Sequence, residues 1–198
     1  MSTIVDYYVS LASPWTYVGG KRLPGIAAAS GATFNVKPIR TGEVFAATGG
    51  LPLPKRHPAR RTYRMQELKR WRAHWNLPMN VEPKFFPVDD GKAGAMVIAA
   101  RQDGQDALAL SNVFLALVWE KEQDIADRSV LTAAADKAGF DGTTLAARID
   151  DDAVAAEYAA NTAEAIEREV FGVPWFLHDG IAYWGQDRID FLERALAK

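Results

Sequence analysis

The stretch IVDYYVSLASPWTYV, residues 4–18, places a short apolar run directly before a helical pattern. Residues 4–9 are rich in β-branched and aromatic types, which is typical of a strand. Ser13 then fits the position that caps a helix, and Pro14 fits the first helical position, where its missing N–H costs nothing. Apolar residues continue at helical spacing at Trp15, Val18, Leu23 and Ile26. The stretch therefore predicts a strand and a helix with Ser13 at their junction.

The next residues complete a β-α-β unit. We expect the helix to kink at Pro24 and to end before Gly31. Residues 33–39, TFNVKPI, alternate as a second strand, and the crossover is long enough for the two strands to be parallel. Residues 40–58 carry many glycines and prolines, which predicts a loop.

From about residue 59 to residue 168 the pattern is helical, and a proline-rich segment at residues 76–91 interrupts it. Four alanine-rich helices are predicted after this interruption. Ser129 and Asp141 are plausible caps within that region, because short polar side chains accept hydrogen bonds from the free N–H groups of a first turn. Gly139 is expected to stop a helix.

The last part of the chain changes character again. Residues 173–185, VPWFLHDGIAYWG, predict a hairpin whose turn is Asp179-Gly180. Residues 186–198, QDRIDFLERALAK, predict a closing amphipathic helix.

Strands at both ends of the chain indicate one shared sheet, because sheet edges rarely stay uncovered. The predicted fold class is α/β: a thioredoxin-like domain interrupted by an α-helical insertion domain. The thioredoxin-like domain would comprise residues 1–40 and 169–198. The helical insertion domain with its connecting loop would comprise residues 41–168.

Composition narrows the classes of function. The chain has 198 residues and a formal net charge of −2, which argues against a dedicated nucleic-acid binder. There is no cysteine, so any thiol chemistry must use the thiol of a ligand. The sequence contains no stretch of about 18 apolar residues, so we expect no membrane span. The first residues have no basic leader and include Asp6 within the apolar run, so we expect a cytoplasmic protein rather than a secreted one.

The three histidines, His57, His74 and His178, have no spacing that suggests a metal site.

Three short motifs could form a site at one end of a thioredoxin-like domain. Ser13 is either a plain helix cap or a hydroxyl that donates to an anion at a helix N-terminus. Val173-Pro174, entering a strand, is either an edge position or a cis peptide that turns backbone groups toward a bound peptide. Asp187 either stabilises the first turn of the last helix or holds an ammonium group.

A cluster of basic side chains precedes and opens the first long helix. It is either a solvated surface or a site for an anion such as a carboxylate. In the nearby segment PKFFP, residues 83–87, Lys84 could bind a carboxylate and Phe85 an aromatic ring, unless the segment is only a connector. The cluster consists of Lys55, Arg56, His57, Arg60, Arg61 and Arg64.

The sequence resembles the 2-hydroxychromene-2-carboxylate isomerase family, which is related to the kappa-class glutathione transferases within the DsbA-like thioredoxin superfamily. The motifs that carry the resemblance are YYVSLASPWTYV (residues 7–18), ELKRWRAHWNLP (residues 67–78) and AIEREVFGVPWFLHDGIAYWGQDR (residues 165–188). The resemblance covers essentially the whole chain.

The resemblance implies a glutathione site. Ser13 takes the position of the family's catalytic serine, and Val173, before a cis Pro174, would pair with the cysteinyl part of glutathione. Arg56 is expected at its glycyl end. The γ-glutamyl end would be held by Trp184, Gly185, Gln186 and Asp187. Substrate contacts are expected from Phe45, Lys55, Lys84 and Phe85.

The implied activity is a glutathione-dependent isomerase, with Ser13 as donor to the glutathione sulfur. The family interconverts 2-hydroxychromene-2-carboxylate and trans-o-hydroxybenzylidenepyruvate in the degradation of aromatic compounds of the naphthalene type. The thiolate would add reversibly, the weakened bond would rotate, and elimination would follow. Two alternatives are a kappa-like transferase that forms stable conjugates and a non-catalytic module that binds peptides or anions. The expected partners are a small aromatic carboxylate and a second copy of the chain in a homodimer. We expect no bound metal and no interaction with a membrane or a nucleic acid.

Overall fold

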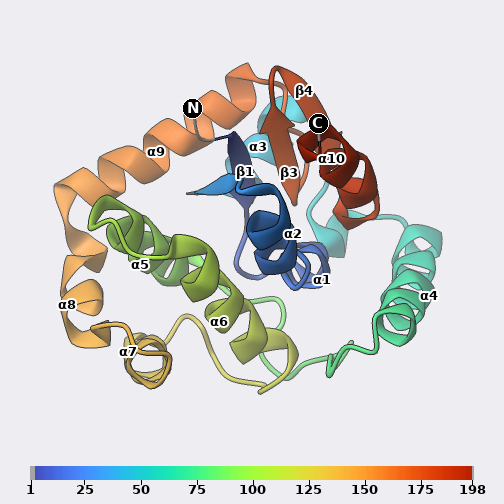
Figure 1. Ribbon diagram of the computed structural model, residues 1–198. Coiled ribbons are helices and arrows are strands. Elements are labelled where there is room, and N and C mark those ends of the chain that lie inside the picture. The colour runs from blue at the N-terminus through green and yellow to red at the C-terminus, as the bar shows by residue number, and fades with distance from the viewer. Residues whose placement is uncertain (1–2, 198) are drawn as a thin grey trace.

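The computed structural model describes residues 3–197, and its centre is a four-stranded sheet in the order β2-β1-β3-β4 (Figure 1). Strands β1 (Ile4–Val9) and β2 (Thr33–Pro38) are parallel, as predicted. Strand β3 (Trp175–His178) is antiparallel to β1, with Tyr7 opposite Phe176. Strand β4 (Ile181–Trp184) is antiparallel to β3. The prediction that both ends of the chain complete one sheet is confirmed.

Helices fill the rest of the chain, mainly between β2 and β3. They are α1 (Pro14–Gly20), α2 (Leu23–Ser30), α3 (Thr41–Thr48), α4 (Pro58–His74), α5 (Gly91–Gln102), α6 (Ala107–Trp119), α7 (Arg128–Lys137), α8 (Gly142–Ala147), α9 (Asp152–Glu167) and α10 (Ile189–Leu196). Three short 3-10 helices lie at Leu53–Lys55, Arg148–Asp150 and Gln186–Arg188. No helix within residues 3–197 is both long and apolar enough to cross a membrane.

The crossover from β1 to β2 corrects one expectation. It contains two helices, α1 and α2, rather than one helix kinked at Pro24. Pro24 lies in the first turn of α2, where a proline leaves no helical hydrogen bond unmade. Gly31 ends α2 in the left-handed conformation, with φ 71°, as expected of a helix stop.

Four further expectations about helices are wrong. Within residues 3–197, five α-helices rather than four lie between the proline-rich segment and β3, because α8 is a separate helix between α7 and α9. Residues 40–58 are not only a loop, because they contain α3 and a 3-10 turn. The cap of α7 is Asp127, whose carboxylate accepts from the Ser129 N–H at 2.8 Å, so Ser129 is capped rather than capping. The closing helix is preceded by a separate 3-10 turn, Gln186–Arg188.

The predictions for Asp141 and for the hairpin are confirmed. Asp141 caps α8, and its carboxylate accepts from the Thr144 N–H at 2.9 Å. Asp179 and Gly180 form the hairpin turn with φ of 49° and 77°. Gly139, with φ 89°, directly follows the C-cap of α7.

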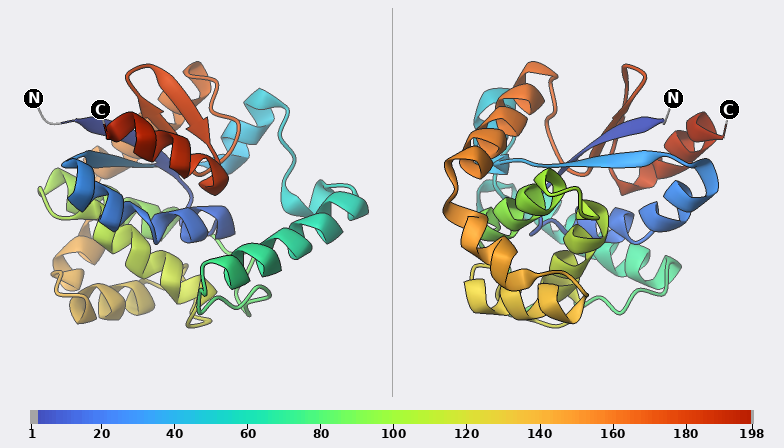
Figure 2. Two further views of the ribbon diagram at one scale, coloured as in Figure 1. Left: turned by 45° about the vertical axis from the view of Figure 1, so that its right-hand side comes forward. Right: turned by 60° about the vertical axis from the view of Figure 1, so that its left-hand side comes forward.

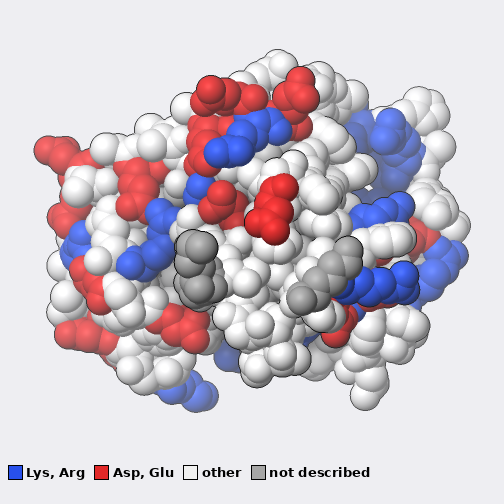
Figure 3. All heavy atoms as spheres, turned by 45° about the horizontal axis from the view of Figure 1, so that its top comes forward, with Lys and Arg blue, Asp and Glu red and all other residues white. Residues whose placement is uncertain are grey.

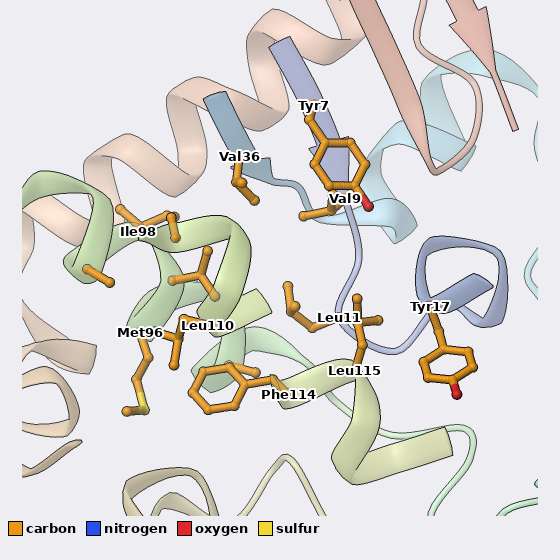
Figure 4. Packing of buried hydrophobic residues seen from close by; sticks show 14 of the residues in the cluster. Tyr7, Val9, Leu11, Tyr17, Val36, Met96, Ile98, Leu110, Phe114 and Leu115 are labelled. Carbon is orange, nitrogen blue, oxygen red and sulfur yellow. The ribbon is translucent and has the colours of Figure 1, made fainter. Parts of the chain in front are cut away.

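Strand β1 is covered on both faces of the sheet, and its side chains alternate between two hydrophobic cores. Val5, Tyr7 and Val9 point into the larger core, where the Tyr7 ring stacks on Phe176 with centroids 4.8 Å apart. Figure 4 shows this core continuing into residues of α5 and α6. Tyr8 points into a smaller cluster on the other face, with α3 and α9.

The helices form layers around this sheet. Helices α5 and α6 pack against β2 and α1, and α7 and α8 lie beyond them, away from the sheet (Figure 2). Helix α4 lies apart from α5–α9 and buries only Leu68 (Figure 1). The larger core contains residues of both predicted domains, 1–40 with 169–198 and 41–168. The division into domains at residues 41 and 168 stays a prediction.

Candidate active site

Ser13 lies at the junction of β1 and α1, where the sequence places it. Its backbone is extended, with φ −76° and ψ 126°, and its Oγ accepts a hydrogen bond from the Thr16 N–H at 3.2 Å. Pro14 occupies the first helical position. The predicted cap is therefore confirmed. The hydroxyl hydrogen of Ser13 stays available to donate, because the cap uses only the oxygen as acceptor.

Ser13 also lines a cavity of about 370 Å³. Its walls come from the β1–α1 loop, α1, α3, the segment at residues 52–56, α4, the segment at residues 86–90, the segment at residues 171–173, and β4. Residues far apart in the sequence thus meet around one hydroxyl. The predicted site residues on these walls are Ser13, Phe45, Arg56, Val173 and Trp184.

Val173 also lines this cavity. The Val173-Pro174 peptide is cis, as expected. Neither the N–H nor the C=O of Val173 bonds to the backbone of another residue within 3–197. Pro174 packs toward α1, near Gly19, and its carbonyl accepts from the Gly185 N–H at 2.9 Å. A bound peptide could pair with Val173 as a strand would.

A second cavity of about 350 Å³ adjoins the first, because Trp15, Val173 and Trp184 line both. It contains the predicted residues Gly185, Gln186 and Asp187. Sequence reasoning missed its other wall, which α4 supplies through Tyr63, Glu67 and Trp71.

The turn at Gly185 shapes this second cavity. Its φ of 94° and the Asp187 carboxylate, which a Cβ would meet at 2.6 Å, both favour glycine there. Gln186 is 3% exposed, and its Oε1 has no hydrogen-bond partner within residues 3–197. The Asp187 carboxylate pairs with Arg188 at 2.8 Å. Gln186 therefore offers an acceptor that a ligand could satisfy.

Trp184 separates the two cavities. Its ring lies 4.6 Å from the Phe171 ring between centroids, and a Cβ on Gly172 would come within 2.8 Å of its Nε1. Half of Trp184 is exposed. Gly172 is thus needed for the ring to lie flat against the backbone that leads to Val173.

Four predicted residues lie outside both cavities. Lys55, Pro174, Lys84 and Phe85 are absent from their walls among the described residues. The Lys84 ammonium lies 5.0 Å above the Phe85 ring instead. Phe86, the next residue, lines the first cavity in its place. Because this segment has no regular structure, the sequence carries no period that would tell the two rings apart.

A carboxylate that sequence reasoning missed also reaches the first cavity. Asp90, at the start of α5, accepts from the Ser10 hydroxyl at 2.6 Å and from the Ala12 N–H at 3.3 Å. Burial raises the pKa of Asp90 above its ordinary value, although these hydrogen bonds oppose the rise. The segment VDD, residues 88–90, stands before a helical pattern and marks a helix start in the sequence. Nothing in the sequence shows that Asp90 contacts Ser10.

Two arginines enter the same cavity from the basic cluster. The Arg56 Nε–H donates to the Leu51 carbonyl at 2.7 Å, and its guanidinium lies 5.8 Å from the Phe45 ring centroid. Arg64, on α4, lies 5.3 Å from the Phe86 ring centroid. Basic side chains gather at the right of the face in Figure 3, the side of α4 in Figure 1.

Comparison with known proteins gives a family match and similar proteins. The model of the DsbA-like thioredoxin domain matches residues 4–197. The chain is 29% identical over 197 residues to 2-hydroxychromene-2-carboxylate isomerase of Sphingobium xenophagum, covering 99% of each chain. A solved 2-hydroxychromene-2-carboxylate isomerase superposes with a TM-score of 0.84 at 28% identity, covering 98% of this chain and 94% of that one.

A more distant relative is glutathione S-transferase kappa 1 of Rattus norvegicus. It is 23% identical over 207 residues, covering 98% of this chain and 91% of the relative. The similarities together support an enzyme, and an isomerase in particular. With its four-stranded sheet and a family match over nearly its whole length, the chain belongs to the DsbA-like thioredoxin domain family.

Proposed function

We propose that the protein is a glutathione-dependent isomerase of 2-hydroxychromene-2-carboxylate and trans-o-hydroxybenzylidenepyruvate. The observation that carries the proposal is the meeting of the Ser13 hydroxyl and the unpaired backbone of Val173 in one cavity of a chain without cysteine. The isomerase relatives support the reaction, and the kappa-class relative supports glutathione as the source of the thiol.

The residues around the cavities fit glutathione chemically. The free N–H and C=O of Val173 suit the peptide backbone at the cysteinyl residue. The unpartnered Oε1 of Gln186 suits an ammonium donor, and Asp187 supplies a negative charge beside it. Trp184 and Gly185 complete that γ-glutamyl end, and Arg56 suits the glycyl carboxylate.

Bound glutathione would supply a thiolate that adds reversibly to the conjugated carbon of the substrate, so that a double bond becomes a single bond able to rotate. The task of Ser13 is to hold this sulfur ionised. A free thiol with a pKa of about 8.5 is only a few per cent ionised at pH 7. A hydrogen bond that lowers the thiol pKa by about two units, or roughly 2.7 kcal/mol, would make the thiolate the main species.

Ser13 acts as a donor rather than as a nucleophile in this proposal. A serine nucleophile needs a base in hydrogen-bond contact. The one hydrogen bond of the Ser13 Oγ within residues 3–197 comes from the Thr16 N–H. The Asp90 carboxylate is bonded to Ser10 and Ala12 instead.

The test of this role is Ser13→Ala, together with Ser13→Asp. Alanine removes both cap and donor, and aspartate keeps the cap but replaces the donor with a negative charge. We expect both variants to lose isomerase turnover and the ultraviolet absorbance of bound thiolate, while only Ser13→Ala loses about 1 kcal/mol of stability. Ser30→Ala, on the last residue of α2, is the control. Full turnover and unchanged thiolate absorbance in Ser13→Ala would overturn the proposal.

A kappa-like transferase is the second candidate, favoured by the similarity to glutathione S-transferase kappa 1. It would use the same site to form stable conjugates with an electrophile. An assay with an aromatic electrophile beside the chromene assay separates the two activities, since a transferase consumes glutathione and an isomerase returns it. The homodimer and the cytoplasmic location stay predictions.

A further inference from the structure

Arg64 carries a charge that the described part of the chain leaves without a counter-ion. It is half-buried on α4, and no carboxylate of residues 3–197 lies within ion-pair distance of it. Its one hydrogen bond within residues 3–197 is a weak one, from Nη1 to the Met65 sulfur at 3.8 Å.

Three other arginines with similarly covered side chains are paired, whereas Arg56, in the same cavity, makes no ion pair within residues 3–197. Arg22 pairs with Asp190, Arg101 pairs with Glu157, and Arg148 pairs with Asp103. A partly buried cation is unfavourable unless something compensates it. The surroundings of Arg64 disfavour its charged form, because burial and the charge of Arg56 lower its pKa to about 10. It stays charged at neutral pH.

The position of Arg64 suits a ligand rather than the bulk solvent. The side chain lines the same cavity as Ser13, and its guanidinium lies over the ring of Phe86. Phe86 is in turn held against the buried Trp119, with ring centroids 4.9 Å apart. The guanidinium is therefore supported on one face, while its planar set of N–H donors can meet a carboxylate through two parallel hydrogen bonds.

We propose that Arg64 is the residue that binds the carboxylate of the aromatic substrate, at a position distinct from the Arg56 site for the glycyl end of glutathione. This inference rests on the proposed function. Two cations in one cavity match two anions. The apolar walls at Phe45, Phe86 and Val88 give an aromatic ring a place beside the Arg64 guanidinium.

The test distinguishes an effect of Arg64 on carboxylate binding from effects on glutathione binding and on turnover. The probe is 2-hydroxycinnamate, a stable aryl carboxylate, and its uncharged counterpart is 2-hydroxycinnamamide. Binding of each is measured by calorimetry with glutathione present at saturation. Glutathione affinity is measured separately. The variants are Arg64→Met, which removes the charge, and Arg64→Lys, which keeps the charge but lacks the planar fork. Arg61→Gln, an exposed position on the same helix, is the control.

We expect the wild-type protein and Arg61→Gln to prefer the carboxylate over the amide. Arg64→Met should weaken carboxylate binding roughly 10-fold to 100-fold, leaving amide binding and glutathione affinity unchanged. Arg64→Lys should lie between. The proposal is overturned if Arg64→Met keeps the preference, if the wild-type protein shows none, or if Arg64→Met loses glutathione affinity to the same extent. A protein that binds the probe through Arg64 yet fails to isomerise the chromene would contradict the proposed function alone.

Discussion

At the scale of single residues, Asp90 connects the helical part of the chain to the loop that carries Ser13. Its carboxylate accepts hydrogen bonds from the Ser10 hydroxyl and the Ala12 N–H. The start of α5 therefore holds Ser10 and Ala12 of the loop that leads to Ser13. The pKa of the Tyr158 hydroxyl on α9 is raised by burial and, to a smaller extent, by the charge of Asp90. The ring of Tyr158 lies under the Arg40 guanidinium. The carboxylate is buried, and burial disfavours its charged form.

This burial predicts a pH-dependent stability. Because the pKa of Asp90 is raised in the folded protein, its ionisation costs stability as the pH rises through that pKa, and the cost is absent below the unfolded pKa of about 4. Asparagine keeps an oxygen that can accept from Ser10 and Ala12. We therefore expect Asp90→Asn to be more stable than the wild-type protein at pH 8, with a smaller gain toward pH 4.

Urea unfolding at several pH values measures this difference. Asp89→Asn, at the exposed neighbouring position, is the control, and we expect no such trend from it. A stability difference between Asp90→Asn and the wild-type protein that stays constant with pH would contradict the role of burial.

Residue-scale features were predictable where neighbours in sequence produce them. The Ser13 cap follows from a short motif, and the cis Val173-Pro174 peptide was one of two alternatives for its motif and the one that the family resemblance implied. Asp90 meets Ser10 across 80 positions of sequence, and Arg64 meets Phe86 only through folding. No local pattern encodes such contacts, so the sequence indicated Arg64 only as one member of a basic cluster and did not indicate Asp90.

At the scale of elements, the hairpin of β3 and β4 carries the chain to Trp184 and Gly185, between the two cavities. Its turn requires positive φ at Asp179 and Gly180. A Cβ at Gly180 would meet no atom within 4 Å, so the only obstacle to a side chain there is the backbone conformation.

We expect Gly180→Ala to destabilise the protein by about 1 kcal/mol, because alanine disfavours the left-handed conformation. Gly25→Ala is the matched comparison, since Gly25 lies in α2 and its Cβ would also meet no atom within 4 Å. In a helix alanine is favoured, so this change should stabilise by up to about 1 kcal/mol. Denaturant unfolding compares the two, and changes of the same sign would contradict the explanation.

Helix α3 shows why some elements escaped prediction. Its sequence TGEVFAAT lies among glycines and prolines that favour a loop. The helix buries only Val44, which joins the smaller core with Ala165 of α9. Packing against a distant helix, rather than a strong apolar period, stabilises this element.

At the scale of the whole molecule, the candidate site lies where the two ends of the chain meet the helical middle. The ends contribute Ser13, Val173 and the turn at Gly185, and the middle contributes Phe45, Arg56, Arg64 and Phe86. The fold class followed from the order of strands and helices in sequence. Of the part of the cavity made by the middle, Phe45 and Arg56 were expected from the resemblance, whereas Phe86 was not, because it lies in an irregular segment.

Every role proposed for this site depends on bound glutathione, and this dependence can be measured. Initial rates of interconversion of 2-hydroxychromene-2-carboxylate and trans-o-hydroxybenzylidenepyruvate, measured with the purified protein with and without reduced glutathione, test it most directly. We predict turnover only with glutathione present and no net loss of glutathione as product accumulates. An equal rate in a preparation freed of glutathione would contradict the account.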